Sequence, residues 1–315
     1  MRRKVTILGA GYVGSTIAYT LAVSTTASEV VLIDINKDKA KGEALDIIQG
    51  TAFYEPVLVY DGEFADAVNS DIVIVAMGLA RKPGQTRLDL AQTNVDIVKD
   101  VIPKVFQYAP NAVYLVVTNP VDVLTYTLIK ACGIPEAQVI GSGTVLDSAR
   151  LRHVLGTRLH INYNAINAYV LGEHGDSSVI PWSIIRVMGI DLNTGYDLIS
   201  DVPGFDLDAE RGGIEAMVRN AGATVIALKG STHYAVALSV KQICEAIYND
   251  LTHCLPLSAM LHGQYGIEDV CLSLPFVIGI NGIRRPIVPI LAPKEEDQMR
   301  NSAQVLKGLI ASLDI

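Results

Sequence analysis

A glycine-rich turn near the amino terminus is the first segment whose residue types suggest chemistry. Gly9, Gly11 and Gly14 follow the apolar run Val5-Thr6-Ile7-Leu8 with the spacing Gly-x-Gly-x-x-Gly. In a turn from a strand into a helix, the first glycine makes the turn, the second lets the backbone approach a pyrophosphate, and the third packs the helix on the strand. We interpret the motif as a dinucleotide site, although the same spacing also occurs in tight turns that bind nothing.

Asp34 follows the apolar run of residues 29–33, about 20 residues beyond the glycine motif, where dinucleotide-binding folds place an acidic residue. A carboxylate at this position accepts hydrogen bonds from both ribose hydroxyls and repels a 2′-phosphate. The sequence therefore favours NAD over NADP as the cofactor. The alternative is an ordinary carboxylate at the entry of a helix.

His174 stands in the segment Leu171-Gly172-Glu173-His174-Gly175-Asp176. Because glycines flank this segment's histidine and leave it little covered, the imidazole can face a cleft and exchange protons near neutral pH. Asp147 and Arg150 are its candidate partners, since they lie one turn apart at the start of a predicted helix and can share a face. The alternatives are a structural histidine and a carboxylate that only complements the helix dipole.

A third group of polar residues lies in the segment Gly78-Leu79-Ala80-Arg81-Lys82-Pro83-Gly84-Gln85-Thr86-Arg87. Glycines and a proline bracket three cations here, which is typical of a mobile loop that binds anions. A solvated basic loop without a ligand is the alternative.

The first 140 residues contain the elements that must position these groups. Short β-branched runs alternate with helical patterns, and the runs cover residues 5–8, 29–33, 71–76, 114–118 and 139–140. Helical periodicity follows a cap at Asn36 and recurs over residues 91–102. Such an alternation predicts an α/β fold with a Rossmann-type, doubly wound parallel sheet.

Beyond residue 143 the pattern changes to long helices mixed with paired strands. We expect helices over residues 146–155, 207–229, 231–248 and 294–313, and strands over residues 165–172 and 270–277. The sequence thus predicts two domains, a nucleotide-binding domain of residues 1–143 and an α+β catalytic domain of residues 144–315. The cavity of interest should lie where the two meet.

Composition excludes several classes of protein. Lys and Arg number 25 against 33 Asp and Glu, a net charge of -8, so nucleic acid and anionic membranes are not expected partners. Because we find neither a signal peptide nor the ~18 apolar residues of a spanning helix, we expect a cytoplasmic protein. The four cysteines are far apart, which predicts reduced thiols and no metal site.

Taken together, the motifs resemble the NAD-dependent L-lactate/malate dehydrogenase family, and within it the bacterial L-lactate dehydrogenases. Besides the glycine motif, the similar segments are residues 82–90, Thr118-Asn119-Pro120-Val121-Asp122, and residues 141–152 and 172–183. The resemblance spans nearly the whole chain. It implies NAD as the cofactor, a small 2-keto or 2-hydroxy acid as the substrate, and a homotetramer.

The resemblance also implies roles for individual residues. His174 would exchange a proton with the substrate oxygen, Asp147 would hold its tautomer, and Arg87 would polarise the carbonyl. Substrate contacts are implied for Arg150, which would clamp the carboxylate, and for Arg81, Asn119 and Thr232. Cofactor contacts are implied for Gly9, Gly11, Val13, Gly14, Asp34, Gly78 and Asn119.

Two positions depart from the pattern of bacterial lactate enzymes. Arg81 occupies a loop position where lactate enzymes carry Gln and malate enzymes carry Arg. Asn167 stands where many bacterial enzymes carry a His that binds fructose 1,6-bisphosphate together with an Arg, which Arg152 matches here. Because a neutral amide supplies no cation for a phosphate, we expect weak or absent activation by this sugar.

Three functions remain open from the sequence. The resemblance favours the interconversion of pyruvate and NADH with L-lactate and NAD, the last step of a glycolytic fermentation. Arg81 keeps malate dehydrogenase as the alternative. A non-catalytic NAD-binding scaffold is the third, but it would have no need for His174, Asp147 and Arg150 together with Arg87.

Overall fold

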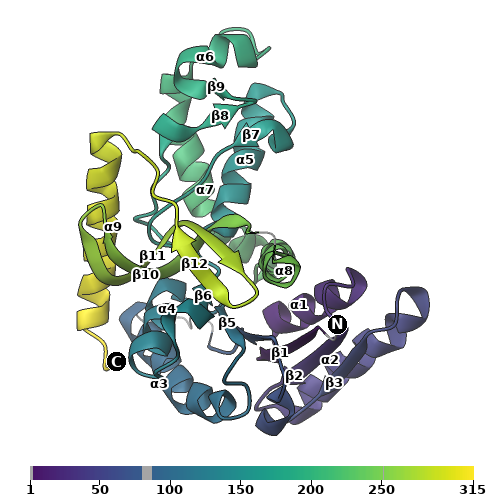
Figure 1. Ribbon diagram of the computed structural model, residues 1–315. Helices are drawn as coiled ribbons and strands as arrows, with labels where there is room; N and C mark the ends of the chain where they lie inside the picture. The colour runs from purple at the N-terminus through teal and green to yellow at the C-terminus, as the bar shows by residue number, and fades with distance from the viewer. Residues whose placement is uncertain (1–2, 80–86, 251) are drawn as a thin grey trace.

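A nine-stranded sheet forms the centre of the computed structural model, which describes residues 3–79, 87–250 and 252–315 (Figure 1). Six neighbouring strands run parallel in the order β6-β5-β4-β1-β2-β3. They are β1 (Lys4–Leu8), β2 (Glu29–Ile33), β3 (Leu58–Asp61), β4 (Ile72–Val75), β5 (Val113–Val116) and β6 (Val139–Gly141). The predicted doubly wound parallel sheet is confirmed, and its strand order reverses between β1 and β4, where such folds bind ligands.

Helices cover the parallel strands, which explains why the strands read as continuous apolar runs. Every residue of β1, β2, β4 and β5 is buried. The covering helices are α1 (Tyr12–Val23), α2 (Lys37–Gln49), α3 (Arg87–Phe106) and α4 (Val121–Lys130). The predicted cap of α2 is confirmed, because the Asn36 side chain accepts a hydrogen bond from the Lys39 N–H.

The second half of the chain extends the same sheet and adds a smaller one. Strands β10 (Cys254–Gln264), β11 (Ile267–Gly279) and β12 (Gly282–Pro286) are antiparallel, and β10 joins β6 through the pair Ser258 and Gly141. The short strands β7 (Ile166–Asn167), β8 (Arg186–Val187) and β9 (Ile190–Asp191) form the second sheet. The helices of this half of the chain are α5 (Val145–Leu159), α6 (Leu192–Ile199), α7 (Leu207–Lys229), α8 (Tyr234–Asn249) and α9 (Pro293–Ala311).

Single turns of 3-10 helix complete the described elements. They are η1 (Gly50–Phe53), η2 (Phe64–Ala67), η3 (Glu136–Gln138), η4 (Tyr163–Ala165) and η5 (Trp182–Ile184). No helix in the described ranges is long and apolar enough to cross a bilayer. The main hydrophobic core lies along the large sheet, and a second one lies between α5, α7 and the small sheet.

Two sequence predictions about the second half were wrong in their extent. The strand expected over residues 165–172 is regular only at Ile166–Asn167, and the chain pairs again only in single bridges at Leu171 and Gly172, where the φ of Gly172 is +83°. The helix expected from Ser231 begins at Tyr234, so that residues 231–233, beside the cavity described below, are neither helix nor strand. Hydrophobic periodicity carries no information about such departures near a ligand site.

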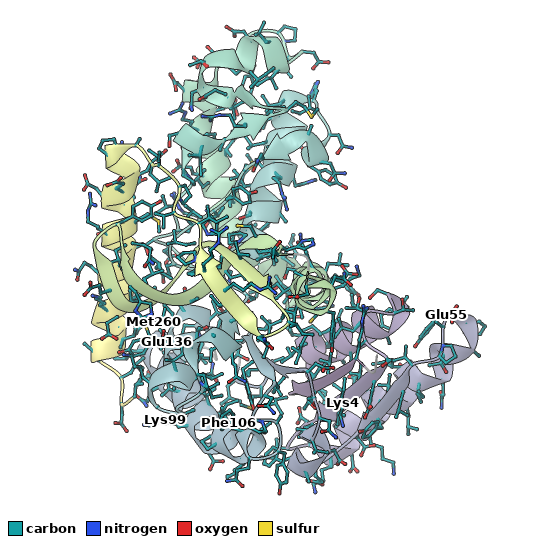
Figure 2. The ribbon with its side chains drawn as sticks, viewed as in Figure 1. Lys4, Glu55, Lys99, Phe106, Glu136 and Met260 are labelled. Atoms are coloured by element: carbon teal, nitrogen blue, oxygen red, sulfur yellow. The ribbon has the colours of Figure 1, made fainter. Side chains whose placement is uncertain are left out.

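A buried ion pair ties β1 to its neighbours in the interior of the sheet. The Lys4 Nζ lies 3.1 Å from the Glu29 Oε1, and the Tyr60 hydroxyl donates to the same carboxylate at 2.8 Å. Both charged side chains are 5% exposed or less, so the attraction between them must offset the free energy that each loses on leaving water. Figure 2 shows Lys4 inside the amino-terminal part of the molecule.

Replacing Glu29 by Leu should destabilise the fold strongly, because it leaves the buried Lys4 ammonium without its carboxylate. We expect a loss of about 3–5 kcal/mol in the free energy of unfolding, measured by urea denaturation. The matched control is Lys4→Met combined with Glu29→Leu, which removes both charges and should recover most of the loss. A single variant as stable as the parent protein would refute the pairing.

Candidate active site

The glycine turn has the shape that a dinucleotide requires. Gly9 has a φ of +103°, and a Cβ there would lie 2.8 Å from the backbone of Met77. A Cβ on Gly14 would lie 1.8 Å from the Gly9 carbonyl oxygen, so only glycine lets α1 pack this closely on β1. A Cβ on Gly11, in contrast, would meet no atom of the described residues within 4 Å. The backbone is therefore open at the residue where a pyrophosphate would approach the helix N-terminus.

Asp34 is held beside this turn by two backbone hydrogen bonds. Its Oδ2 accepts from the Ala10 N–H at 2.6 Å and its Oδ1 from the Asn36 N–H at 2.8 Å. These bonds fix the carboxylate at the carboxyl end of β2, next to the glycine turn and partly exposed. Val13, in the first turn of α1, is partly buried against the core. The residues present thus fit the adenosine side of a dinucleotide.

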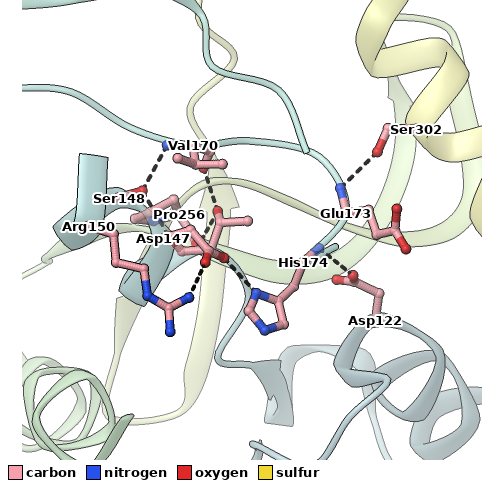
Figure 3. Close-up of polar contacts among 10 residues, drawn as sticks. Asp122, Asp147, Ser148, Arg150, Val170, Glu173, His174, Pro256 and Ser302 are labelled. Carbon is pink, nitrogen blue, oxygen red and sulfur yellow. Dashed lines mark hydrogen bonds and ion pairs between the residues drawn. The ribbon is translucent and has the colours of Figure 1, made fainter. Parts of the chain in front are cut away.

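His174 and Asp147 form a close charged pair at the carboxyl edge of the sheet (Figure 3). The His174 Nδ1 lies 2.6 Å from the Asp147 Oδ2, and Asp147 stands in the first turn of α5. Because a carboxylate only accepts, Nδ1 carries a proton and the other ring nitrogen, Nε2, remains for chemistry. The Arg150 Nη1 donates to the second carboxylate oxygen at 2.8 Å, so the predicted shared face of α5 is observed.

The electrostatics of this pair favour the charged form of each partner. Burial lowers the pKa of His174, but the charge and hydrogen bond of Asp147, with the charge of Asp122, outweigh it, so that the pKa is raised above 6.5. Burial likewise raises the pKa of Asp147, and His174 and Arg150 more than offset it, leaving the pKa below 3.8. The site therefore holds an imidazolium at a higher pH than an isolated histidine does.

Two further contacts fix the backbone of the histidine loop, and sequence reasoning missed both. The His174 N–H donates to the Asp122 Oδ2, and the Glu173 N–H donates to the Ser302 Oγ, each at 2.8 Å. Asp122 belongs to the first turn of α4 and Ser302 to α9, so helices far apart in the sequence meet at this loop (Figure 3). Burial raises the pKa of Asp122 to about 6, against hydrogen bonds that lower it.

A cavity of about 380 Å³ lies beside the charged pair. His174, Asp147 and Arg150 line it from the second half of the chain, and Asn119 from the first. Thr232 lines it from the segment before α8, together with Arg219 of α7. The predicted catalytic and substrate-binding residues whose side chains the structure describes thus meet in one space large enough for a small organic acid, whereas the glycine turn and Asp34 are not among its lining residues.

A buried amide joins the start of the cationic loop to this cavity. The Asn94 Oδ1 accepts from the Leu79 N–H at 2.9 Å, and its Nδ2 donates to the Asn119 carbonyl at 2.8 Å. A Cβ on Gly78 would lie 2.5 Å from the Thr118 Cγ2, so this position needs glycine. Asn94 was missed because a lone Asn in an amphipathic helix gives no signal before the loop is placed beside it.

Four further residues were predicted for the substrate site or for an effector site. Arg81 lies outside the described residues, and Arg87 begins α3 with a side chain that is not described. Arg152 is half-buried on α5, whereas Asn167 is exposed on β7. Among the described residues, no cluster of three His, Cys, Asp or Glu could hold a metal ion.

Replacing Asp122 by Ala should slow the reduction of pyruvate that the sequence predicts, because the His174 N–H loses its acceptor. A buried donor without a partner costs about 1–3 kcal/mol, so we expect kcat/KM to fall roughly 10- to 100-fold. The conservative variant Asp122→Asn keeps an acceptor and should restore most of the activity, with equal thermal stability of both variants as the control. Equal activity of the two variants would exclude a positioning role.

Comparison with known proteins agrees with this geometry. Residues 3–141 match the NAD binding domain of the lactate/malate dehydrogenases, and residues 144–313 match their alpha/beta C-terminal domain. The chain is 47% identical over 312 residues to an L-lactate dehydrogenase of Thermoanaerobacter sp. strain X514, with 99% of each chain covered. It is 44% identical over 310 residues to L-lactate dehydrogenase 1 of Clostridium acetobutylicum, with 98% of each covered.

Solved structures share the whole fold. The minor L-lactate dehydrogenase of Enterococcus mundtii, in a ligands-bound form, superposes with a TM-score of 0.94 at 35% identity, covering 100% of this chain and 99% of the other. An L-lactate dehydrogenase of Clostridium thermocellum gives 0.86 at 37% identity, covering 98% and 99%. The malate alternative is not favoured by these relatives. The chain belongs to the lactate/malate dehydrogenase family, and its cofactor is NAD.

Proposed function

We propose that the protein is an L-lactate dehydrogenase that interconverts pyruvate and NADH with L-lactate and NAD. The observation that carries the proposal is the contact of His174 and Arg150 with one carboxylate, Asp147, at the wall of a single cavity. A proton donor and a cation held together in this way suit a substrate that has an oxygen to protonate next to a carboxylate to bind. The names of the relatives supply the identity of that acid.

His174 is the proposed catalytic acid and base. With Nδ1 bound to Asp147, the imidazolium donates from Nε2 to the keto oxygen during reduction and accepts the proton back during oxidation. Asp147 stabilises the cation and fixes the ring orientation, because its second oxygen is itself held by Arg150. Bound NADH supplies the hydride, and the glycine turn with Asp34 is the proposed site that holds it.

Arg150 is the proposed anchor for the substrate carboxylate. Its guanidinium carries five N–H donors, of which one bonds Asp147 here, and a planar fork can bind a carboxylate through two parallel hydrogen bonds. Such an anchor fixes which face of the keto group meets the cofactor. Asn119 and Thr232, at the cavity wall, are the proposed side contacts, and Arg87 is proposed to polarise the carbonyl.

The wider sequence predictions belong to the same proposal. We propose a cytoplasmic homotetramer with a domain boundary between residues 143 and 144. Activation by fructose 1,6-bisphosphate should be weak, because Asn167 is an exposed neutral amide while Arg152 is a single half-buried cation. One cation binds a bisphosphate loosely in water.

The substrate proposal predicts a preference among keto acids. NADH oxidation should be faster with pyruvate than with oxaloacetate, and Arg81→Gln should lower turnover of oxaloacetate while pyruvate turnover stays equal or improves. The preference for pyruvate rests on the relatives. The effect of Arg81→Gln is expected because a guanidinium at the methyl group of pyruvate would gain no partner, whereas the second carboxylate of oxaloacetate would supply one. A preference for oxaloacetate of about tenfold in kcat/KM, roughly 1.4 kcal/mol, would instead establish a malate enzyme.

The charged pair predicts a specific pH dependence. Reduction needs protonated His174, whose pKa is raised, so kcat/KM for pyruvate should fall only as the pH rises through a value above 6.5. Asp147→Asn removes the anion that raises this pKa and leaves burial to lower it, so the fall should move to lower pH.

The control for this pH profile is His174→Asn. This variant should lose about 10²–10⁴-fold in turnover, because it has no group to give the proton, while it still binds NADH. A profile that is the same in the parent protein and in Asp147→Asn would show that Asp147 does not set the protonation of His174.

A further inference from the structure

An imidazole outside the catalytic pair contacts the first residue of α1, within the glycine motif. The ring of His233, in the segment before α8, stacks on the ring of Tyr12 with centroids 5.7 Å apart and an angle of 23° between the planes. Tyr12 is the first residue of α1 and lies inside the glycine motif, with 72% of its surface exposed. Figure 1 shows α1 and α8 side by side, so this contact joins the two halves of the chain.

The hydrogen bonds of His233 define its protonation state. Its Nε2 lies 3.2 Å from the Lys229 Nζ, and its Nδ1 lies 3.0 Å from the Ser231 Oγ. An ammonium group can only donate, so Nε2 carries the lone pair and Nδ1 carries the hydrogen that faces Ser231. In this arrangement the ring is neutral, and a second proton would place two cations 3.2 Å apart.

The charged groups around this ring are positive. Lys229, at the end of α7, contacts the ring itself and also lies 4.0 Å above the ring of Tyr234. Lys39 of α2 lies 5.9 Å above the ring of Tyr12, on which His233 stacks. Burial and the charge of Lys229 both lower the pKa of His233. Tyr12 and Tyr234 pack against the imidazole.

A dianion is the ligand that such a cluster fits. Gly11 has no side chain to cap the N-terminus of α1, and none of the described residues fills the space beside this glycine. Helix N-terminal N–H groups attract phosphate there, one residue from Tyr12. We propose that His233 and Lys229 bind the pyrophosphate of NAD from the α8 side, and that His233 takes up a proton when the cofactor binds.

The direction of the pH effect follows from linkage. In the free protein, burial and the charge of Lys229 lower the pKa of His233, which favours the neutral ring. The negative charge of a pyrophosphate favours the imidazolium, so the pKa of His233 is higher in the complex than in the free protein. Affinity for NADH therefore rises as the pH falls through the pKa of the complex, and levels off below that of the free protein.

The experiment is a titration of the protein with NADH alone, followed by nucleotide fluorescence from pH 5.5 to 8.5. For the parent protein we expect NADH binding up to about tenfold tighter at pH 5.5 than at pH 8.5. His233→Gln keeps a side chain of similar size that forms hydrogen bonds but cannot be charged, so its Kd for NADH should vary less than about twofold over the same pH range. Calorimetry at pH 6 in two buffers of different ionisation enthalpy counts the proton taken up, and His233→Gln should lose that uptake.

Two further variants, one at a control histidine and one at Lys229, test whether the pH effect belongs to His233. His262→Gln removes another exposed histidine, which lies in β10 and pairs with Glu136 of η3. This variant should leave the pH dependence of NADH binding unchanged. Lys229→Met should weaken NADH binding at every pH and move the transition to higher pH, because it removes the cation that disfavours charged His233.

An unchanged pH dependence and proton uptake in His233→Gln would overturn the proposal. Since no keto acid is present in these titrations, the outcome is independent of whether pyruvate is the substrate.

Discussion

The hydrogen-bonded contact between His174 and Asp147 is the interaction on which the site depends. A buried imidazole loses its proton unless an anion faces it, and a buried carboxylate loses its charge unless cations face it. Asp147 meets both requirements because its two oxygens bond different partners, His174 and Arg150. The acid that protonates a substrate and the cation that anchors it are therefore coupled through one side chain, and moving either would disturb the other.

Helices from several parts of the fold hold His174 and Asp147 in position for this contact. Asp147 is placed by α5, which begins where β6 ends, whereas His174 sits on an irregular loop whose backbone is bonded to Asp122 and Ser302. Because those two residues come from α4 and α9, the loop is determined by helices on different parts of the sheet. The same α4 begins two residues after Asn119, so the Asn119 side of the cavity and the histidine loop share one support.

Sequence reasoning succeeded where chemistry and local geometry coincide. The glycine turn, Asp34 and the pair of Asp147 with Arg150 could be predicted, since each rests on spacing within one element. Asp122, Asn94 and His233 could not, because each acts through a partner that only the folded chain brings near. The same reason explains the strand predicted over residues 165–172, where apolar residues continue but the chain leaves β7 after Asn167 and pairs again only in single bridges at Leu171 and Gly172. Periodicity reports burial, and burial alone does not distinguish a strand from a packed loop.

The central claim is that Asp147 keeps His174 charged against the cost of burying it. The most direct measurement is the pKa of His174 in the ligand-free protein, followed by the ring resonances of isotopically labelled histidine across the pH range and assigned with His174→Asn. We expect a value above 6.5, the ordinary pKa of a histidine. A value at or below 6.5 would mean that burial outweighs the carboxylate, and would contradict the role given to Asp147.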